Sequence, residues 1–210
     1  MKSCLTLLAA LVLLTATAAE TPKAPKVKPP ECSFTVTPKP GDSHVAKSGT
    51  SRLIQNNSSF GSNTGSKTIT RNLRWTVETR FREDRPEKLE LKAFYLGTDE
   101  KNKIVKLGEE TKKLELDKNG RASVDLTSPT TKLTKSRTTS ISRHAGGGAG
   151  FRSTKSTTRG ERVTGCVLRL FADDRLVKTW TSDPRWATEA KAETFSVDNL
   201  NKNSGKIGLR

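Results

Sequence analysis

The clearest pattern in the chain is an alternation of apolar and polar residues that begins at Ile69. Every second residue from Ile69 to Phe81 is largely apolar, with Trp75 and Val77 at the centre, and the residues between them are polar. Successive side chains of a β-strand point to opposite faces, so the pattern predicts a long half-buried strand. The alternation returns over Lys88–Leu96 and predicts a second strand there.

Shorter runs predict further strands and two hairpins. Alternation predicts a strand over Glu31–Pro38, and apolar positions also recur over Thr111–Asp117 and Arg121–Leu126. The turn Asp117–Gly120 between these last two contains Asn-Gly, a strong hairpin signal. A second hairpin is predicted to join Arg162–Ala172 to Arg175–Ser182 across Asp173 and Asp174.

The C-terminal part predicts one helix and a final strand. Ser182-Asp183-Pro184 is typical of a helix start and predicts a short helix to about Lys191. A final strand is predicted over Glu193–Val197, so the predicted domain spans residues 32–198 and a polar tail follows over residues 199–210. Many short strands with one short helix favour an all-β, antiparallel, immunoglobulin-like sandwich; a small β-barrel is the alternative. The predicted core is Trp75, Leu89, Leu91, Val167, Leu170 and Trp180.

The first nineteen residues predict a secretory signal peptide. A short positive start precedes an apolar run over Leu5–Leu14, and small residues at Ala16–Ala19 offer cleavage sites. The mature chain is expected to begin at Ala19 or Glu20, to hold no transmembrane segment and to work in the periplasm, at the outer membrane or outside the cell. A retained anchor helix is the alternative. Residues 20–31 are rich in Pro and Lys and predict an extended linker.

The formal net charge of +16 favours polyanionic partners. For an exported protein these are acidic glycans or other anionic surfaces, and nucleic acid is not the expected partner. The alternative is that the cations only keep a weakly apolar chain soluble.

Much of this charge lies in residues 127–162, which are dominated by Ser, Thr, Gly, Lys and Arg. A loop this long is functional or disordered, so a flexible basic loop is predicted, with a mobile centre at Gly146–Gly150 and a possible polar edge strand over Thr130–Ser142. Residues 41–67 also read as loop, except for a short strand at Ser51–Gln55. The candidate polyanion-binding residues are Arg137, Arg143, Arg152, Lys155 and Arg159.

Two cysteines remain once Cys4 leaves with the signal peptide. Cys32 and Cys166 both lie on apolar sides of predicted strands, and an even count in an exported chain predicts a disulfide between them. Two free buried thiols are the alternative.

Catalytic and metal-binding signatures are not found in the sequence. The chain has no Gly-x-Ser-x-Gly and no His-Glu-x-x-His, and its two histidines, His44 and His144, lie in polar stretches. We therefore expect no catalytic residues, no metal and no cofactor, and a hydrolase ranks third among the functions considered.

Two regions carry a family resemblance. They are Arg74–Arg80 leading into Leu89–Gly97, and Val167–Val177 followed by Trp180–Trp186. Together they resemble small exported immunoglobulin-like sandwich proteins of bacterial cell envelopes, including a pilus-associated type similar in fold to archaeal type IV pilus subunits. The resemblance implies a non-enzymatic structural, adhesive or pilus-associated role, with other envelope or pilus proteins as partners. Binding of acidic glycans or other polyanions through the basic segment is the alternative function.

Overall fold

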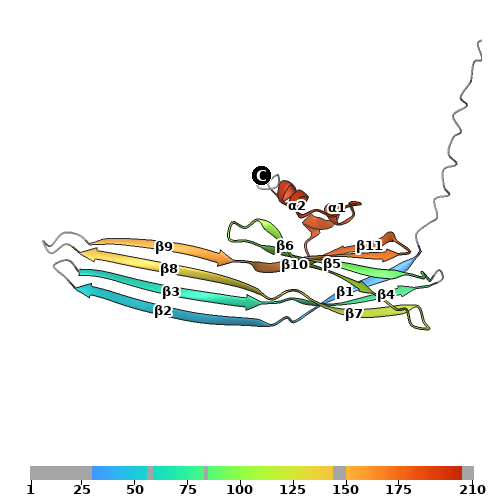
Figure 1. The fold of residues 1–210 in the computed structure, drawn as a ribbon, viewed down its shortest axis with the longest axis horizontal. Coiled ribbons are helices and arrows are strands. Elements are labelled where there is room, and N and C mark those ends of the chain that lie inside the picture. The colour runs from blue at the N-terminus through green and yellow to red at the C-terminus, as the bar shows by residue number, and fades with distance from the viewer. Residues whose placement is uncertain (1–29, 56–58, 83–84, 144–149, 205–210) are drawn as a thin grey trace, which may run out of the picture.

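The computed structural model describes residues 30–55, 59–82, 85–143 and 150–204. The predicted signal peptide, most of the predicted linker and residues 146–149 of the glycine-rich run lie outside this part of the chain. The described chain has two parts, a sandwich that we call the body and a four-stranded sheet, the arm, that projects from one end of it (Figure 1).

The body is an open antiparallel β-sandwich. One sheet has the order β1 (Cys32–Lys39), β4 (Arg74–Phe81), β7 (Arg121–Thr127). The facing sheet has the order β11 (Arg175–Thr181), β10 (Arg162–Ala172), β5 (Leu89–Thr98), β6 (Ile104–Lys113). Each sheet ends in edge strands and does not close, so the all-β sandwich is confirmed and the barrel alternative is wrong.

The core between the two sheets is built from the inward side of the predicted alternation. The burial of β4 alternates along its length, with Trp75, Val77 and Phe81 almost fully buried. The Trp75 and Tyr95 rings stack across the sheets with centroids 6.0 Å apart. Of the predicted core residues, Trp75, Leu89, Leu91 and Leu170 belong to this cluster, and Trp180 packs against it half-buried.

A second apolar cluster covers the outer face of the body sheet β11-β10-β5-β6. Phe94, Leu96 and Val167 lie beneath three short C-terminal helices, η1 (Pro184–Trp186), α1 (Ala187–Ala190) and α2 (Val197–Ser204). Val167 is therefore buried as predicted, but in this cluster and not between the sheets. Among the described residues, no helix is long and apolar enough to cross a membrane.

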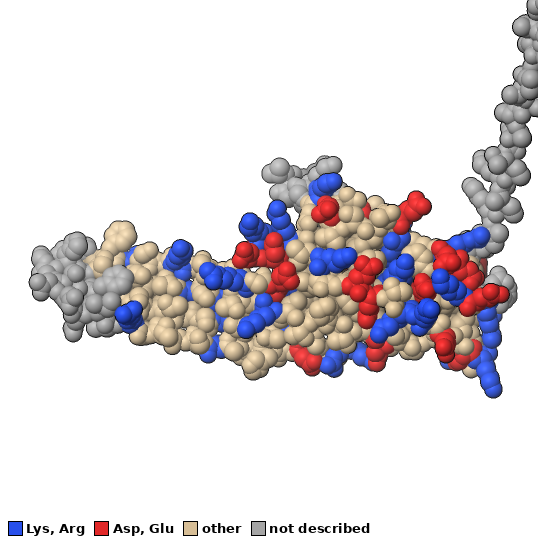
Figure 2. Space-filling model, in the orientation of Figure 1, with Lys and Arg blue, Asp and Glu red and all other residues tan. Residues whose placement is uncertain are grey.

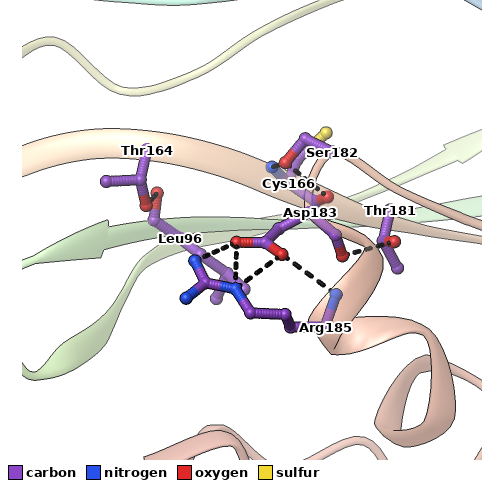
Figure 3. A network of polar contacts seen from close by, with 7 residues as sticks. All are labelled: Leu96, Thr164, Cys166, Thr181, Ser182, Asp183 and Arg185. Carbon is purple, nitrogen blue, oxygen red and sulfur yellow. Dashed lines mark hydrogen bonds and ion pairs between the residues drawn. The ribbon is translucent and has the colours of Figure 1, made fainter. Parts of the chain in front are cut away.

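The predicted helix start is confirmed in detail (Figure 3). The Asp183 side chain accepts a hydrogen bond from the Arg185 N–H at 3.0 Å, and Pro184 occupies the first turn. The Ser182 hydroxyl accepts from the Cys166 N–H at 2.9 Å, which ties the helix start to β10. The predicted strand over Glu193–Val197 is wrong, since Val197 begins α2, and residues 199–204 of the predicted tail are helical because Val197 and Leu200 pack into the second cluster.

The arm consists of β2 (Ser43–Gln55), β3 (Ser59–Arg71), β8 (Thr131–Arg143) and β9 (Phe151–Gly160), in that order across the sheet. The prediction of a flexible loop over residues 127–162 is therefore wrong for the described residues. Thr130–Ser142 is indeed a strand, but β8 pairs on both sides and is not an edge. The loop predicted over residues 41–67 is replaced by β2 and most of β3.

The arm continues the strand order of the body. Only a few residues separate β1 from β2, β3 from β4 and β7 from β8. The order β2-β3-β8 in the arm therefore repeats the order β1-β4-β7 in the body. The strand predicted over Ile69–Phe81 is therefore divided at Asn72 and Leu73 between arm and body. β9 differs, since it leads into β10 of the facing sheet.

Buried polar residues form the junction between arm and body. Ser128, which is 3% exposed, accepts a hydrogen bond from the Leu73 N–H at 2.9 Å through its hydroxyl group. The Asn72 side chain accepts from the Asp42 N–H at 2.7 Å and donates to the Asp42 carboxylate at 3.0 Å. Thr131 donates to the Arg71 carbonyl and accepts from the Val163 N–H, each at 3.1 Å. These bonds connect all four places where strands pass from body to arm.

A glycine permits the passage from β9 to β10. Gly160 has φ = +97°, and a Cβ there would lie 2.2 Å from the Lys132 carbonyl oxygen. Only glycine adopts this conformation with the neighbouring strand so close.

The two predicted hairpins have different outcomes. The β10–β11 hairpin is confirmed, with Asp173 and Asp174 at φ = 48° and 63°, as the favoured two-residue hairpin turns require. The turn at Asp117–Gly120 also forms, with a bond of 3.0 Å from the Gly120 N–H to the Asp117 carbonyl. It joins no hairpin, however, because β6 pairs with β5 and β7 pairs with β4.

The predicted disulfide between Cys32 and Cys166 is wrong, since both are free thiols. Both contact the same core, as expected. Cys32, however, opposes Phe81, six residues or about 20 Å along β4 from Trp75. Cys166 opposes Tyr95, whose ring stacks on Trp75. The two cysteines therefore lie near different ends of the core, too far apart for a disulfide.

We predict that Ser128→Ala destabilises the protein by about 1–3 kcal/mol, because the half-buried Leu73 N–H loses the buried side chain that accepts from it. Chemical denaturation measures the change. Ser156→Ala, on exposed β9, is the matched control and should change the free energy of unfolding by less than about 0.5 kcal/mol. Equal stability of the two variants would contradict the role of the junction.

We also predict that neither cysteine reacts readily with a thiol reagent in the native protein at pH 8. Burial raises the pKa of both thiols, and Cys166 is fully buried, so little thiolate is present to react. Mass spectrometry of labelled peptides should show Cys166 modified only after denaturation, with Cys32 modified slowly before it. A Cys32–Cys166 disulfide in the purified protein would contradict the structure.

Candidate polyanion-binding surface

The arm concentrates positive charge without any acidic residue. Its strands carry two Lys or Arg residues in β2, two in β3, four in β8 and three in β9, and no Asp or Glu. In Figure 2 the acidic side chains gather over the body, whereas the arm shows basic and uncharged residues. Every ion pair given for the described residues lies outside the four arm strands.

The pairing register divides the arm into two faces. Directly opposed residues of neighbouring strands share a face, and alternate residues along each strand lie on the same face. One face, which we call the lysine face, carries Lys47, Lys67, Arg71, Lys135, Arg137 and Arg152. The other, the hydroxyl face, carries Ser and Thr on β3 and along most of β8, and its cations are Arg52, Lys132, Lys155 and Arg159.

The five predicted binding residues do not form one site. Arg137 and Arg152 lie on the lysine face, and the side chain of Arg143 lies outside the described part of the chain. Lys155 and Arg159 oppose Thr138 and Thr134 and lie on the hydroxyl face. The composition therefore located a basic segment, but the strands direct its cations to opposite sides of the arm.

Three lysines that the sequence analysis missed form the centre of the lysine face. Lys47 is directly opposite Lys67, and Lys67 is directly opposite Lys135, so the three form a row across β2, β3 and β8. All three side chains are exposed. Directly opposed residues are about 4.5–5.5 Å apart at Cβ, where like charges destabilise a sheet. A bound polyanion would remove this repulsion.

The cations continue along the arm from the lysine row. Arg137 is two residues beyond Lys135, and Arg152 opposes Ile141, four residues beyond Arg137. At about 3.3 Å per residue, Lys135 and Arg152 are roughly 20 Å apart along the strands. The lysine face thus offers a row of cations across the strands and a track of cations along them, which suits an extended polymer.

The hydroxyl face is organised by hydrogen bonds between side chains. Thr64 bonds with Thr138 at 3.2 Å, Thr68 with Thr134 at 3.1 Å, and Ser48 with Ser66 at 3.1 Å. These pairs link β2, β3 and β8 and stabilise an arm that has little apolar packing. Of the two histidines, His44 lies in β2 on this face, and His144 is outside the described residues.

We predict that Lys67→Thr stabilises the free protein by about 0.2–1 kcal/mol, because Lys67 is the middle member of the lysine row and opposes Lys47 and Lys135. Thermal or chemical denaturation at low ionic strength measures the change, which should shrink when salt is added. Lys155→Thr removes the same charge from a position opposite Thr138 and is the control. A loss of stability in Lys67→Thr larger than in the control would contradict the argument.

A scan against models of protein families found no match, and no curated protein matches the chain.

Proposed function

We propose that this protein is an exported, non-catalytic adhesive sandwich of the bacterial cell envelope that binds acidic glycans through the lysine face of its arm. The observation that carries the proposal is the row of Lys47, Lys67 and Lys135 in a sheet that has no acidic residue. Directly opposed lysines destabilise the free sheet, so an anionic ligand that neutralises them would stabilise it.

The shape of the molecule supports adhesion. The arm projects from the body as a single layer, so both of its faces are available to a polymer outside the molecule (Figure 1). Its cations are flanked by hydroxyl groups such as those of Ser156 and Thr158, which oppose Arg137 and Lys135. Sulfate and carboxylate groups accept hydrogen bonds from both kinds of donor.

The surface favours a glycan over a single-stranded nucleic acid. Proteins that bind single strands stack the bases on aromatic side chains. The exposed aromatic residue described in the arm, Phe151, opposes Ser142 and therefore lies on the hydroxyl face, away from the lysine row. The expected export of the chain also favours a glycan over a nucleic acid.

Two quadruple variants test the proposal. One replaces the lysine-face residues Lys47, Lys67, Lys135 and Arg137 with Ser, and the other replaces the hydroxyl-face residues Arg52, Lys132, Lys155 and Arg159 with Ser. Both remove four charges from exposed positions of the arm strands. Binding of each to heparin, as a model acidic glycan, is measured over a range of salt concentrations.

The lysine-face variant should bind heparin at least about tenfold more weakly and with a shallower dependence on salt, because fewer cations contact the polymer. The hydroxyl-face variant should bind within about threefold of the unmodified protein, since its missing cations lie on the other side. An equal loss in both variants would mean that net charge alone drives binding and would overturn the proposal. Undiminished binding in the lysine-face variant would also reject it.

A second function, assembly with a partner strand, is favoured by one observation. Strand β2 is thirteen residues long and pairs only with β3 among the described strands, so its other edge is open to a further strand. This is the arrangement that a pilus-associated or structural role requires. The bond from the Asn72 N–H to the Asp42 carbonyl and the pairing register direct the N–H groups of even-numbered β2 residues toward β3 and those of odd-numbered residues toward the open edge. Val45→Pro would therefore remove an N–H from this edge and should abolish association with an envelope partner, as sedimentation measures, while heparin binding persists.

A further inference from the structure

A cavity of about 540 Å³ lies on the body, away from the arm. It is bounded by the outer face of the body sheet β11-β10-β5-β6 and by the chain segment that leads into α2. Its volume is in the range of small-molecule sites. Three phenylalanines, Phe94, Phe171 and Phe195, line it together with the cations Lys92, Lys106 and Arg169.

Arg169 is a buried guanidinium without an acidic partner. Its side chain is 5% exposed, and Nη2 donates to the backbone carbonyls of Ala192 at 2.8 Å and Glu193 at 3.1 Å. Nε is buried and has no partner among the described residues. Nη1 donates to no described group, and Arg169 lines the cavity. A buried cation normally pairs with an anion, and the described part of the chain supplies none to Arg169.

A second cation lies beside Arg169. Lys92 is directly opposite Arg169 in the β5–β10 pair, and both lie over the ring of Phe171, with the Lys92 ammonium 5.0 Å and the Arg169 guanidinium 5.3 Å from its centroid. The aromatic ring attracts both cations but cannot remove their mutual repulsion.

The carboxylates around the cavity do not neutralise this pair. Glu109 forms an ion pair with Lys106 at 3.1 Å. Glu193 and Asp198 are exposed, and neither forms an ion pair with Lys92 or Arg169. The cavity therefore presents two cations side by side with space in front of them.

The aromatic residues supply an apolar wall next to these cations. Phe94 and Phe195 contact each other with centroids 4.7 Å apart, and Phe195 and Phe171 are both half-buried, so parts of their rings face outward. We propose that the cavity binds a carboxylate carried on a ring. The carboxylate accepts hydrogen bonds from Arg169 Nη1 and the Lys92 ammonium, and the ring packs against the phenylalanines.

This ligand chemistry occurs in sugar acids and in aromatic acids. A hexuronate has a carboxylate and an apolar ring face formed by its C–H groups, and a hydroxybenzoate has a carboxylate and an aromatic ring. The site is independent of the arm, so it goes beyond the proposed function.

Isothermal titration calorimetry and heteronuclear NMR with four probes test the proposal on the full chain. Glucuronate and 4-hydroxybenzoate carry both parts of the ligand, glucose lacks the carboxylate, and acetate lacks the ring. We expect binding of at least one of the first two, with shifts of the Lys92, Arg169 and Phe195 amide signals, and at least about tenfold weaker binding of glucose and acetate. Which of the first two binds more tightly distinguishes a sugar acid from an aromatic acid.

Lys92→Gln should weaken that binding about tenfold, because it removes one of the two charge-assisted hydrogen bonds without altering Arg169. Lys112→Gln is the matched control, since Lys112 lies on β6 of the same sheet but does not line the cavity. Arg169→Met is less informative alone, because Arg169 also holds the carbonyl groups of Ala192 and Glu193, and its folding is therefore checked by circular dichroism.

Several results would overturn the proposal. They are binding of acetate as tight as that of glucuronate and 4-hydroxybenzoate, equal effects of Lys92→Gln and Lys112→Gln, or no binding of any probe at millimolar concentration. In that case Arg169 would serve only to hold the segment before α2. The lysine-face variant of the arm should bind the probes normally, so failure here and failure of the proposed function are distinguishable.

Discussion

The hydrogen bonds of Ser128, Asn72 and Thr131 hold the arm to the body, and the rest of the structure depends on them. A single-layer sheet with polar residues on both faces buries too little apolar surface to offset the conformational entropy of its backbone. The arm instead takes its strand order and its starting register from the sandwich. The three residues are at most 8% exposed and bond to backbone or side-chain groups at each crossing between the two parts.

This dependence explains how charge can be concentrated in the arm. Repulsion between Lys47, Lys67 and Lys135 would favour fraying in an isolated hairpin, but in the arm the body fixes the strands from which these lysines project. Ladders of hydroxyl pairs such as Thr64–Thr138 add local stability on the opposite face. Stability thus comes from the body and the hydroxyl face, which leaves the lysine face free for binding.

Sequence patterns predicted the body well, because its strands have one buried and one solvated face. The alternation around Trp75 and Val77 follows directly from that geometry, as does the hairpin at Asp173 and Asp174. The same reasoning failed for the arm, where Ser, Thr and Lys lie on both faces and no apolar alternation exists to detect. Gly49 and Gly65, which usually indicate loops, lie within its strands. The sequence did not predict helix α2, because the two apolar residues that pack it against the sheet, Val197 and Leu200, are too few to form a clear helical pattern.

The candidate site was predictable in its chemistry but not in its geometry. Basic composition identified β8 and β9, yet only the register shows that Arg137 and Lys155 face opposite sides and that Lys47 and Lys67 join Arg137. Arg169 was not identified because its lack of an acidic partner is visible only in the fold.

We propose that a bound polymer contacts one face of the arm and not the other. Lysine acetylation of the protein, with and without heparin, followed by mass spectrometry tests it most directly. We expect heparin to protect Lys47, Lys67 and Lys135 from acetylation, while Lys132 and Lys155 on the other face of the arm react at unchanged rates. Equal protection of both sets, or protection confined to lysines of the body, would contradict it.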